Sequence, residues 1–446
     1  MAQAQRADQA VGLGVHVGSD GITDGDHSLT IIEFSRIGYA DNVAPMKETN
    51  ETSEPATPLK NVRVIDMGQY IAGPGAAMVL AELGAQVIKI EPLAGDQARH
   101  IGRYGESMIR AYSRGKQSIA LDLKNETGRD IAWRLIGGCD VVIQNLRPGA
   151  VEALGFGPQA VRERFPKVIY LSISGFGDQG PSSARPGYDI AAQAESGLMS
   201  VTGEPDRLPQ KVGVPIIDAA AAHLGAQAVL AALYGRTQTG VGETLRTSLL
   251  EVALHLQATT VCDYLGGAPE PTRIGDGQPH NAPAAEVVPT RDGHIVLSAY
   301  ADAHWARFCR VMGRDLLATD PRFRTNALRV EHRAELRAVL RECLSSRTSE
   351  ECVTLLSANQ IVVGFVRSYR QVLQSADVQA SGLLIDAPGA DGGSYPSLGL
   401  PYRLGDAPRA NPSAAPACGA DTDSVLAQLG LGADEIAGLR RTGAVA

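Results

Sequence analysis

The chain of 446 residues is long enough for two or three domains of ~100–200 residues each. Hydrophobic residues make up 44% of it and charged residues 20%, an ordinary balance for a globular protein with a sizeable core. The formal net charge of −8 argues against a general nucleic-acid-binding surface, so an anionic ligand must meet a local basic cluster.

Signals for a membrane, for secretion and for metal binding are not evident. No stretch approaches ~18 consecutive apolar residues, and the N-terminal sequence MAQAQRADQA lacks the apolar core of a secretory signal, so we expect a cytoplasmic protein without a membrane span. The six cysteines form no CxxC pair, which is typical of reduced thiols. The nine histidines show no HxxxH or HExxH pattern, so no metal is expected.

Residues 1–57 are rich in Gly, Asp, Ser and Thr and lack sustained periodicity. This composition predicts a loose N-terminal extension, in which SLTIIEF (28–34) is compatible with one short strand.

A βαβ unit follows. NVRVIDM (61–67) is a β-branched run typical of a buried strand, AAMVLAELG (76–84) is helical and ends on a glycine suited to a C-cap, and QVIKIE (86–91) is a second strand. The order implies a parallel sheet with right-handed crossovers.

The alternation of strands and helices continues along the chain. Further strands are predicted at 118–123, 140–145 and 167–177, and helices at 128–138 and 151–165. The pattern predicts an α/β fold with a Rossmann-like, doubly wound large domain. Two long helices then begin at Ala219 and at Thr247.

The sequence pattern changes after Pro271. An Arg-Asp-Gly turn within residues 286–300 predicts a hairpin, and 304–313 and 334–346 are amphipathic helices, which together indicate a smaller α+β domain. The chain ends in two short predicted helices, each of which begins with acidic residues. We therefore predict a large domain at 58–265, a small domain at 266–379, and a C-terminal segment, 380–446, that returns to the large domain.

The βαβ unit first suggests a dinucleotide site. Gly73 and Gly75 open the helix, and Glu91 closes the second strand where an acid would bind a ribose hydroxyl. The third glycine of the fingerprint falls on Met78, however, and Lys89 places a cation on the same strand. An NAD-dependent dehydrogenase stays as an alternative, beside plain βαβ packing and a different nucleotide-like ligand at the same helix start.

Basic residues follow several of the strands. Arg114 and Lys116 lie in YSRGKQ, Lys124 follows the strand at 118–123, and Arg147 lies in QNLRPG. Ligands on open parallel sheets bind beyond the carboxyl ends of strands, so these cations predict a phosphate-rich ligand. The alternative is that they are solvated surface charges.

Residues 185–223 hold two candidate carboxylates, Asp189 and Asp218. Asp218 follows the apolar run VGVPII and directly precedes an Ala-rich helix, so the simplest interpretation is a helix N-cap. A carboxylate at a helix start is also ionised and held in place, and is then a usable nucleophile toward an acyl carbonyl. Both interpretations can hold together.

From Leu59 almost to its C-terminus the sequence resembles the class III CoA-transferases, the group that contains the formyl-CoA and carnitine transferases. The blocks that carry the resemblance are VIDMGQYIAGPGAAMVLAELGAQVIKIEP (64–92), KQSIALDLKNETGR (116–129), DVVIQNLRPGAVEALGFG (140–157), VIYLSISGFGDQGP (168–181), RPGYDIAAQAESGLMSVTGE (185–204), VGVPIIDAAAAHLGAQAVLAAL (212–233) and GADTDSVLAQLG (419–430).

The resemblance implies an enzyme that moves CoA from an acyl-CoA to a small carboxylic acid without a metal or redox cofactor. Asp218 matches the family nucleophile, which forms an acyl anhydride and then an enzyme–CoA thioester, and Asp189 matches an acidic position near the site. The CoA contacts that it implies are Tyr70, Ile71, Ala72, Leu121, Lys124, Asn145 and Leu146, to which the basic loop adds Arg147. It also implies ring-like chains that interlock as a homodimer.

An α-methylacyl-CoA racemase is the alternative on the same fold. The racemases place a His where this chain has Tyr188, and tyrosine is a weak base for proton abstraction at neutral pH. A glycine-rich loop that covers the intermediate in some transferases corresponds to 273–284, which holds only two glycines here.

Overall fold

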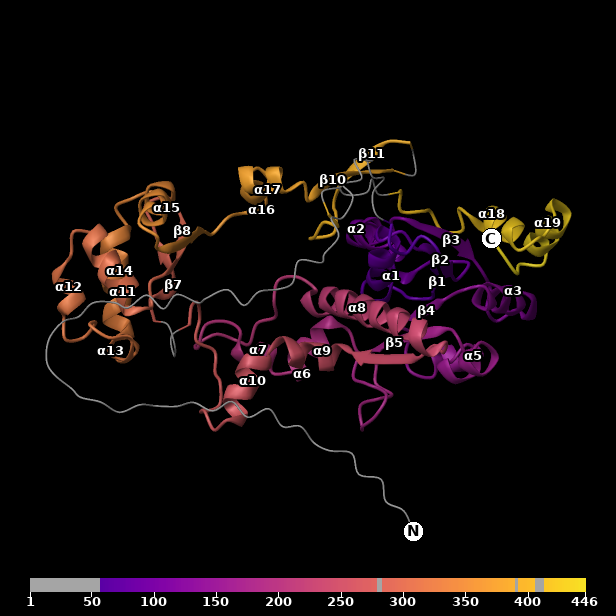
Figure 1. Cartoon of the computed structure of the whole chain (residues 1–446), viewed down its shortest axis with the longest axis horizontal. Helices are drawn as coiled ribbons and strands as arrows, with labels where there is room; N and C mark the ends of the chain where they lie inside the picture. The colour runs from indigo at the N-terminus through magenta and orange to yellow at the C-terminus, as the bar shows by residue number, and fades with distance from the viewer. Residues whose placement is uncertain (1–56, 279–282, 390–391, 406–412) are drawn as a thin grey trace, which may run out of the picture. The chain divides into compact units, whose positions relative to one another are not determined.

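The computed structural model describes residues 57–278, 283–389, 392–405 and 413–446 (Figure 1). The strand expected at 28–34 lies outside the described residues. All elements given below belong to the unit Ser53–Ala446.

Six parallel strands form the central sheet, in the order β3-β2-β1-β4-β5-β6. They are β1 (Arg63–Asp66), β2 (Gln86–Glu91), β3 (Lys116–Ala120), β4 (Val141–Gln144), β5 (Ile169–Ser174) and β6 (Thr244–Ser248). The prediction of an α/β fold on a parallel sheet is confirmed. The strand order reverses between β1 and β4, and ligands of open parallel sheets bind beyond the carboxyl ends of strands at such a point.

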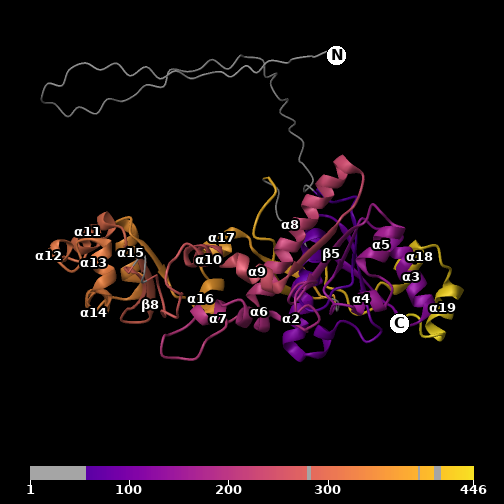
Figure 2. The same ribbon diagram turned by 90° about the horizontal axis from the view of Figure 1, so that it is seen from below.

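Helices cover both faces of this sheet (Figure 2). Helices α1 (Ala72–Glu82), α8 (Ile216–Thr239) and α9 (Leu249–Leu256) pack on one face. Helices α3 (Glu126–Gly137), α5 (Pro158–Arg164), α18 (Thr422–Gln428) and α19 (Ala433–Arg441) pack on the other. Successive strand residues point to opposite faces, so Val141 and Ile143 enter the first core while Val142 enters the second.

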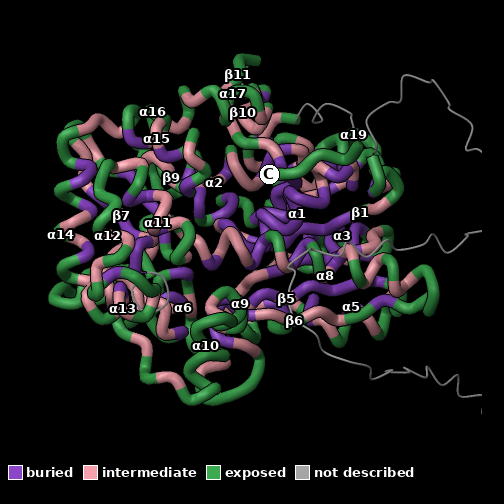
Figure 3. Tube along the Cα trace, turned by 60° about the vertical axis from the view of Figure 1, so that its left-hand side comes forward, coloured by how far each residue is buried: buried purple, intermediate pink, exposed green. Residues whose placement is uncertain are grey.

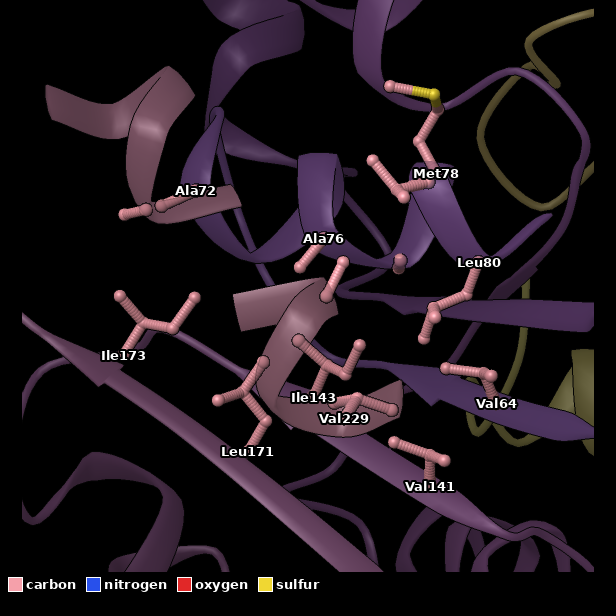
Figure 4. Packing of buried hydrophobic residues seen from close by; sticks show 14 of the residues in the cluster. Val64, Ala72, Ala76, Met78, Leu80, Val141, Ile143, Leu171, Ile173 and Val229 are labelled. Carbon is pink, nitrogen blue, oxygen red and sulfur yellow. The ribbon is translucent and has the colours of Figure 1, made fainter. Parts of the chain in front are cut away.

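The first core lies between the sheet and the pair α1 and α8 (Figure 4). Val64, Ile143 and Val229 are fully buried there. Gly75 permits the close approach of the two helices, since a Cβ at that position would lie 2.7 Å from the Cβ of Ala222. In Figure 3 the buried residues are concentrated along these strands and helices.

A second sheet of three antiparallel strands has the order β7-β8-β9: β7 (Ala285–Pro289), β8 (His294–Ser298) and β9 (Val362–Phe365). It shares a separate core with α11 (Asp302–Val311), α14 (Arg333–Leu344) and α15 (Ser349–Ala358). Trp305 and Phe308 are buried at the centre of this core. The hairpin predicted within 286–300 is confirmed, as are both amphipathic helices.

The C-terminal helices pack into the second core of the large sheet. Val425 and Ile436 lie in the same buried cluster as Ile65 of β1. The strands β10 (Leu384–Pro388) and β11 (Ser394–Leu398) form an antiparallel pair before them. The remaining helical segments are η1 (Gln97–His100), α2 (Gly102–Tyr112), α4 (Ala150–Ala153), α6 (Asp189–Glu195), α7 (Leu198–Val201), α10 (Ala258–Leu265), α12 (Leu316–Thr319), α13 (Asn326–Glu331), α16 (Tyr369–Leu373) and α17 (Ala376–Ser381).

The single long helix predicted from Thr247 is wrong. Residues 244–248 form the edge strand β6, and the helical part breaks at Gln257 into α9 and α10. The short run TLRTS is only partly buried, so it carries no strong apolar signal, and pairing with β5 decides its conformation. Ser248 then accepts a hydrogen bond from the N–H of Glu251 and caps α9.

Helix α8 is long and apolar enough to cross a membrane, judged by length and composition alone. Its residues Ile217, Ala221 and Val229 are buried against the sheet, and a core helix passes the same test.

Candidate active site

A cavity of about 270 Å³ opens at the carboxyl ends of β1, β4 and β5, beside the first turn of α8. The predicted residues that line it are Tyr70, Ala72, Asn145, Leu146, Arg147, Tyr188 and Asp218. They come from segments that are far apart in the sequence, from Tyr70 to Asp218. Because all of these segments end or begin at one edge of the sheet, the fold gathers them around one space.

Three of the predicted CoA contacts do not line the cavity, and neither does Asp189. Ile71 and Leu121 are buried in the protein interior, and Leu121 forms an isolated bridge with Val445 near the C-terminus. Lys124 is exposed just beyond β3.

Asp218 is the third residue of α8, which begins at Ile216, so its interpretation as a helix N-cap is wrong. The cap comes from Asp189, whose Oδ2 accepts hydrogen bonds from the backbone N–H groups of Ile217 (2.8 Å) and Asp218 (3.2 Å). The other carboxylate oxygen of Asp189 accepts from Nε2 of Gln193 at 2.5 Å. Asp189 is therefore buried behind the cavity and leaves the Asp218 side chain free of a capping role.

Burial raises the pKa of Asp218 to about 7, and the negative charge of Asp189 adds to this rise. The positive end of α8 acts in the opposite sense, since it favours the ionised carboxylate. Asp218 is also the one carboxylate among the described residues that line the cavity. A poorly solvated carboxylate at the wall of a cavity is suited to attack an acyl carbonyl.

Two tyrosines form one wall of the cavity. The rings of Tyr70 and Tyr188 meet edge to face, with centroids 5.7 Å apart and an interplanar angle of 82°. The hydroxyl of Tyr70 donates to Oε1 of Gln97 at 2.7 Å. Burial, followed by the proximity of Tyr188, raises the pKa of Tyr70, so this hydroxyl stays protonated at neutral pH.

Sequence reasoning missed Gln69, Gln97 and Arg185, all of which line the cavity. Gln69 directly precedes the predicted Tyr70, and Arg185 begins the block RPGYD, so both stood within motifs already singled out. Gln97 lies in η1, and only the tertiary structure brings it to the cavity.

The predicted cation cluster is wrong for two of its four members. Lys116 is buried, and its Nζ contacts Oδ2 of Asp66 and the carbonyl oxygen of Pro74, both at 2.7 Å. Arg114 pairs with Glu82 and donates to the carbonyl of Leu398 at 2.7 Å. These two cations form ion pairs with carboxylates of the protein and hydrogen bonds with its backbone carbonyls. Only Lys124 and Arg147 of the four lie at the surface.

Glu91 does not offer a ribose-binding carboxylate. Both of its oxygens accept from Arg99, at 2.7 and 2.8 Å, and Oε1 also accepts from the hydroxyl of Ser118 at 2.6 Å. Asp96 donates its backbone N–H to the same group. These internal partners remove the feature on which the dinucleotide alternative depended.

Within the described residues, no group of three His, Cys, Asp or Glu side chains could hold a metal ion. All six cysteines are free thiols.

Comparisons with known proteins agree on one family. Residues 59–422 match the model of CoA-transferase family III. The chain is 35% identical to the succinate–glutarate CoA-transferase of Agrobacterium fabrum, over 83% of this chain and 96% of the relative. It is 38% identical to a probable fatty acyl-CoA transferase of Mycobacterium tuberculosis, over 73% of this chain and 86% of the relative. A crystal structure of a CaiB/BaiF family protein from Brucella suis superposes with a TM-score of 0.76 at 32% identity, covering 84% of this chain and all of that one.

Proposed function

The chain belongs to CoA-transferase family III and transfers coenzyme A between an acyl-CoA and a carboxylate, and we propose that the carboxylate of Asp218 is its covalent nucleophile. The observation that carries the proposal is the position of Asp218: it is the carboxylate that lines the cavity, at the first turn of α8, with its basicity raised by burial.

In the first half of the proposed reaction, an oxygen of Asp218 attacks the thioester carbonyl of the donor. The carbon–sulfur bond breaks, which gives an acyl–aspartyl anhydride and CoA thiolate. The thiolate then attacks the aspartyl carbonyl, and the donor acid leaves as a carboxylate while the enzyme keeps CoA as a thioester.

The second half reverses these steps with the acceptor acid. Its carboxylate attacks the aspartyl thioester, CoA thiolate leaves, and an anhydride with the new acyl group forms. Attack of the thiolate on that acyl carbonyl releases the new acyl-CoA and regenerates the Asp218 carboxylate. Because every nucleophile and leaving group is an anion, the cycle needs no net proton transfer, and we propose that it needs no cofactor.

We propose a dicarboxylic acid as the preferred substrate. Arg147 and Arg185 both line the cavity, and a guanidinium group binds a carboxylate with paired hydrogen bonds. The relative named for succinate and glutarate uses such acids. The relative named as a probable fatty acyl-CoA transferase supports a longer monocarboxylic acid as the second candidate.

We further propose a cytoplasmic homodimer of interlocked chains with a Rossmann-like large domain. The six-stranded order 3-2-1-4-5-6 supports the fold description. Exposed apolar side chains on α9 and α10, among them Leu256 and Leu265, support a partner that covers them. The free thiols are compatible with a reducing compartment.

The racemase alternative has less support. Racemisation requires two groups that exchange a proton with one carbon. The carboxylate of Asp189 is occupied by the α8 backbone and Gln193, and Tyr188 stands where a racemase has its His.

The test is a chemical trap. The enzyme is incubated with an acyl-CoA donor alone and treated with hydroxylamine, and we expect mass spectrometry to find a hydroxamate on Asp218. In heavy water with a 2-methylacyl-CoA, we expect little deuterium at the α-carbon. Rapid deuterium uptake without a trapped hydroxamate would falsify the proposal in favour of the racemase.

A further inference from the structure

The side chains of Asp66, Lys89 and Lys116 are charged groups of the large sheet that are completely buried and take no part in the chemistry above. Nζ of Lys89 lies 2.9 Å from Oδ2 of Asp96 and 3.8 Å from Oδ2 of Asp66, while Nζ of Lys116 lies 2.7 Å from Asp66. Taking charges out of water costs free energy that their mutual attraction often fails to recover. A buried network of this kind is therefore weak evidence for a contribution to stability, and what its groups hold in place is the more informative observation.

The network contacts the loop between β1 and α1, where Gln69 and Tyr70 line the cavity. Gly68 is fixed at both of its polar backbone groups. Its N–H donates to Oδ1 of Asp66 at 2.8 Å, and its carbonyl oxygen accepts from Nζ of Lys89 at 2.7 Å. Lys89 therefore joins a carbonyl group of the cavity loop to the carboxylates of Asp66 and Asp96.

Asp96 holds the next part of the loop. Its Oδ1 accepts from the backbone N–H of Tyr70 at 3.2 Å and from that of Ala98 at 2.9 Å, while Oδ2 pairs with Lys89. Tyr70 has a φ of 63°, in the left-handed region that residues with a Cβ rarely adopt. Such a conformation persists only where its surroundings hold it. It directs the Tyr70 ring against Tyr188 in the cavity wall.

We propose that Lys89 and Asp96 are positioning residues of the CoA-thioester site. Neither side chain lines the cavity. Together they fix the backbone from Gly68 to Tyr70 and so keep the Tyr70 ring and the Gln69 side chain where the thioester binds. The inference rests on the proposed function of the cavity, but it concerns affinity for CoA and not the identity of the nucleophile.

The test compares two substitutions of one side chain. Asp96→Ala removes the acceptor of the Tyr70 N–H, and we expect it to raise the Kd for CoA and the KM for acyl-CoA about tenfold, with kcat changed less than about threefold. Asp96→Asn keeps an acceptor oxygen and loses only the charge that faces Lys89, so we expect a rise of about threefold. Calorimetric CoA binding does not depend on Asp218 as a nucleophile, so its result is separate from that of hydroxylamine trapping.

Asp140→Ala is the matched control. The Asp140 carboxylate also accepts a backbone N–H, that of Arg63 at 2.8 Å, and pairs with Arg236 at 2.7 Å, but it lies at the amino end of β4. We expect a lower melting temperature and an unchanged Kd for CoA. If Asp96→Ala behaves in the same way, with lower stability and unchanged CoA affinity, the proposal is overturned.

A double-mutant cycle provides a measurement that general destabilisation of the fold does not change. Glycine adopts the left-handed conformation without steric cost, so in a Tyr70→Gly background Asp96→Ala should weaken CoA binding less than it does in the native chain. Equal effects in the two backgrounds would contradict the proposal. If Asp96→Ala does not fold, Asp96→Asn is measured in both backgrounds instead. An unchanged Kd for CoA in Asp96→Asn would overturn the proposed role of the ion pair between Lys89 and Asp96.

Discussion

The Oδ2 atom of Asp189 lies 3.2 Å from the backbone nitrogen of Asp218 and accepts its N–H. One carboxylate thus caps the helix that carries the other, and its negative charge contributes to the pKa of about 7 at Asp218. The arrangement separates two roles that a single aspartate at a helix start would otherwise combine. Asp189 orders the helix end, and Asp218 is left available for chemistry.

Replacement of Asp218 should abolish transfer without unfolding the protein. We expect Asp218→Asn to lower kcat at least about a thousandfold, because no other carboxylate among the described cavity residues can form the anhydride. The cap remains, since Asp189 supplies it. The control is Asp434→Asn, an exposed first-turn aspartate of α19, which should keep full activity. A folded Asp218→Asn protein with substantial activity would rule out the nucleophile.

The same variant should change the pH dependence of stability. The pKa of Asp218 is about 7 in the folded protein and ~4 for an unperturbed aspartate. Between these values the folded state binds the proton more tightly, so the Asp218 contribution to the free energy of unfolding falls as pH rises from about 4 to about 7. Denaturant unfolding across this range should show a smaller decrease in the free energy of unfolding with rising pH for Asp218→Asn than for the native protein.

The rate of the first half-reaction should rise with pH through an apparent pKa near 7 and then level, because only ionised Asp218 attacks. Asp189→Asn keeps one acceptor oxygen for the helix but removes the negative charge that raises the pKa of Asp218. The midpoint of the pH–rate profile should therefore move to lower pH. Single-turnover release of the donor acid, measured at a series of pH values, gives this midpoint. A midpoint that stays in place or moves upward would show that Asp189 does not act through its charge.

Arg185 should discriminate dicarboxylic from monocarboxylic acids. We expect Arg185→Ala to raise the KM for a dicarboxylic acceptor about tenfold and to leave that of a monocarboxylic acid of equal length nearly unchanged. Arg246→Ala is the matched control. The side chains of both arginines are 52% exposed and each forms an ion pair with an acidic side chain, but Arg246 does not line the cavity. Equal KM changes for both acids would argue against a distal carboxylate.

Lys124 should contact the phosphates of CoA from beyond the cavity, since it is exposed at the carboxyl end of β3. We expect Lys124→Ala to raise the KM for acyl-CoA severalfold, and less for an analogue that lacks the ribose phosphate. Lys167→Ala provides the comparison, because Lys167 is an exposed lysine near the amino end of β5. If neither CoA substrate responds to Lys124→Ala, this residue has no part in binding.

The proposed dimer is tested by light scattering at low micromolar concentration. The particle should have about twice the mass of one chain and should not dissociate on dilution, because interlocked chains cannot separate without unfolding. An active monomer would contradict the assembly.

The sequence by itself determined the local features of this protein. Apolar β-branched runs such as 86–91 became buried strands, and the order of strands and helices specified a parallel sheet, because both signals depend on neighbouring residues. The sequence motifs likewise identified seven of the residues that line the cavity, including Asp218 and Tyr188.

Only the tertiary structure decided which charges are internal and which face the cavity. Lys116 begins β3 and Lys124 follows it, and the two look alike in the sequence, yet one is buried against Asp66 and the other is exposed. The strand β6 depends on its pairing with β5, and the cap of α8 comes from Asp189, 29 residues away. The physical reason is the same in each case: burial, ion pairing and strand pairing depend on groups that are distant along the chain, and their positions follow only when the whole sheet has formed.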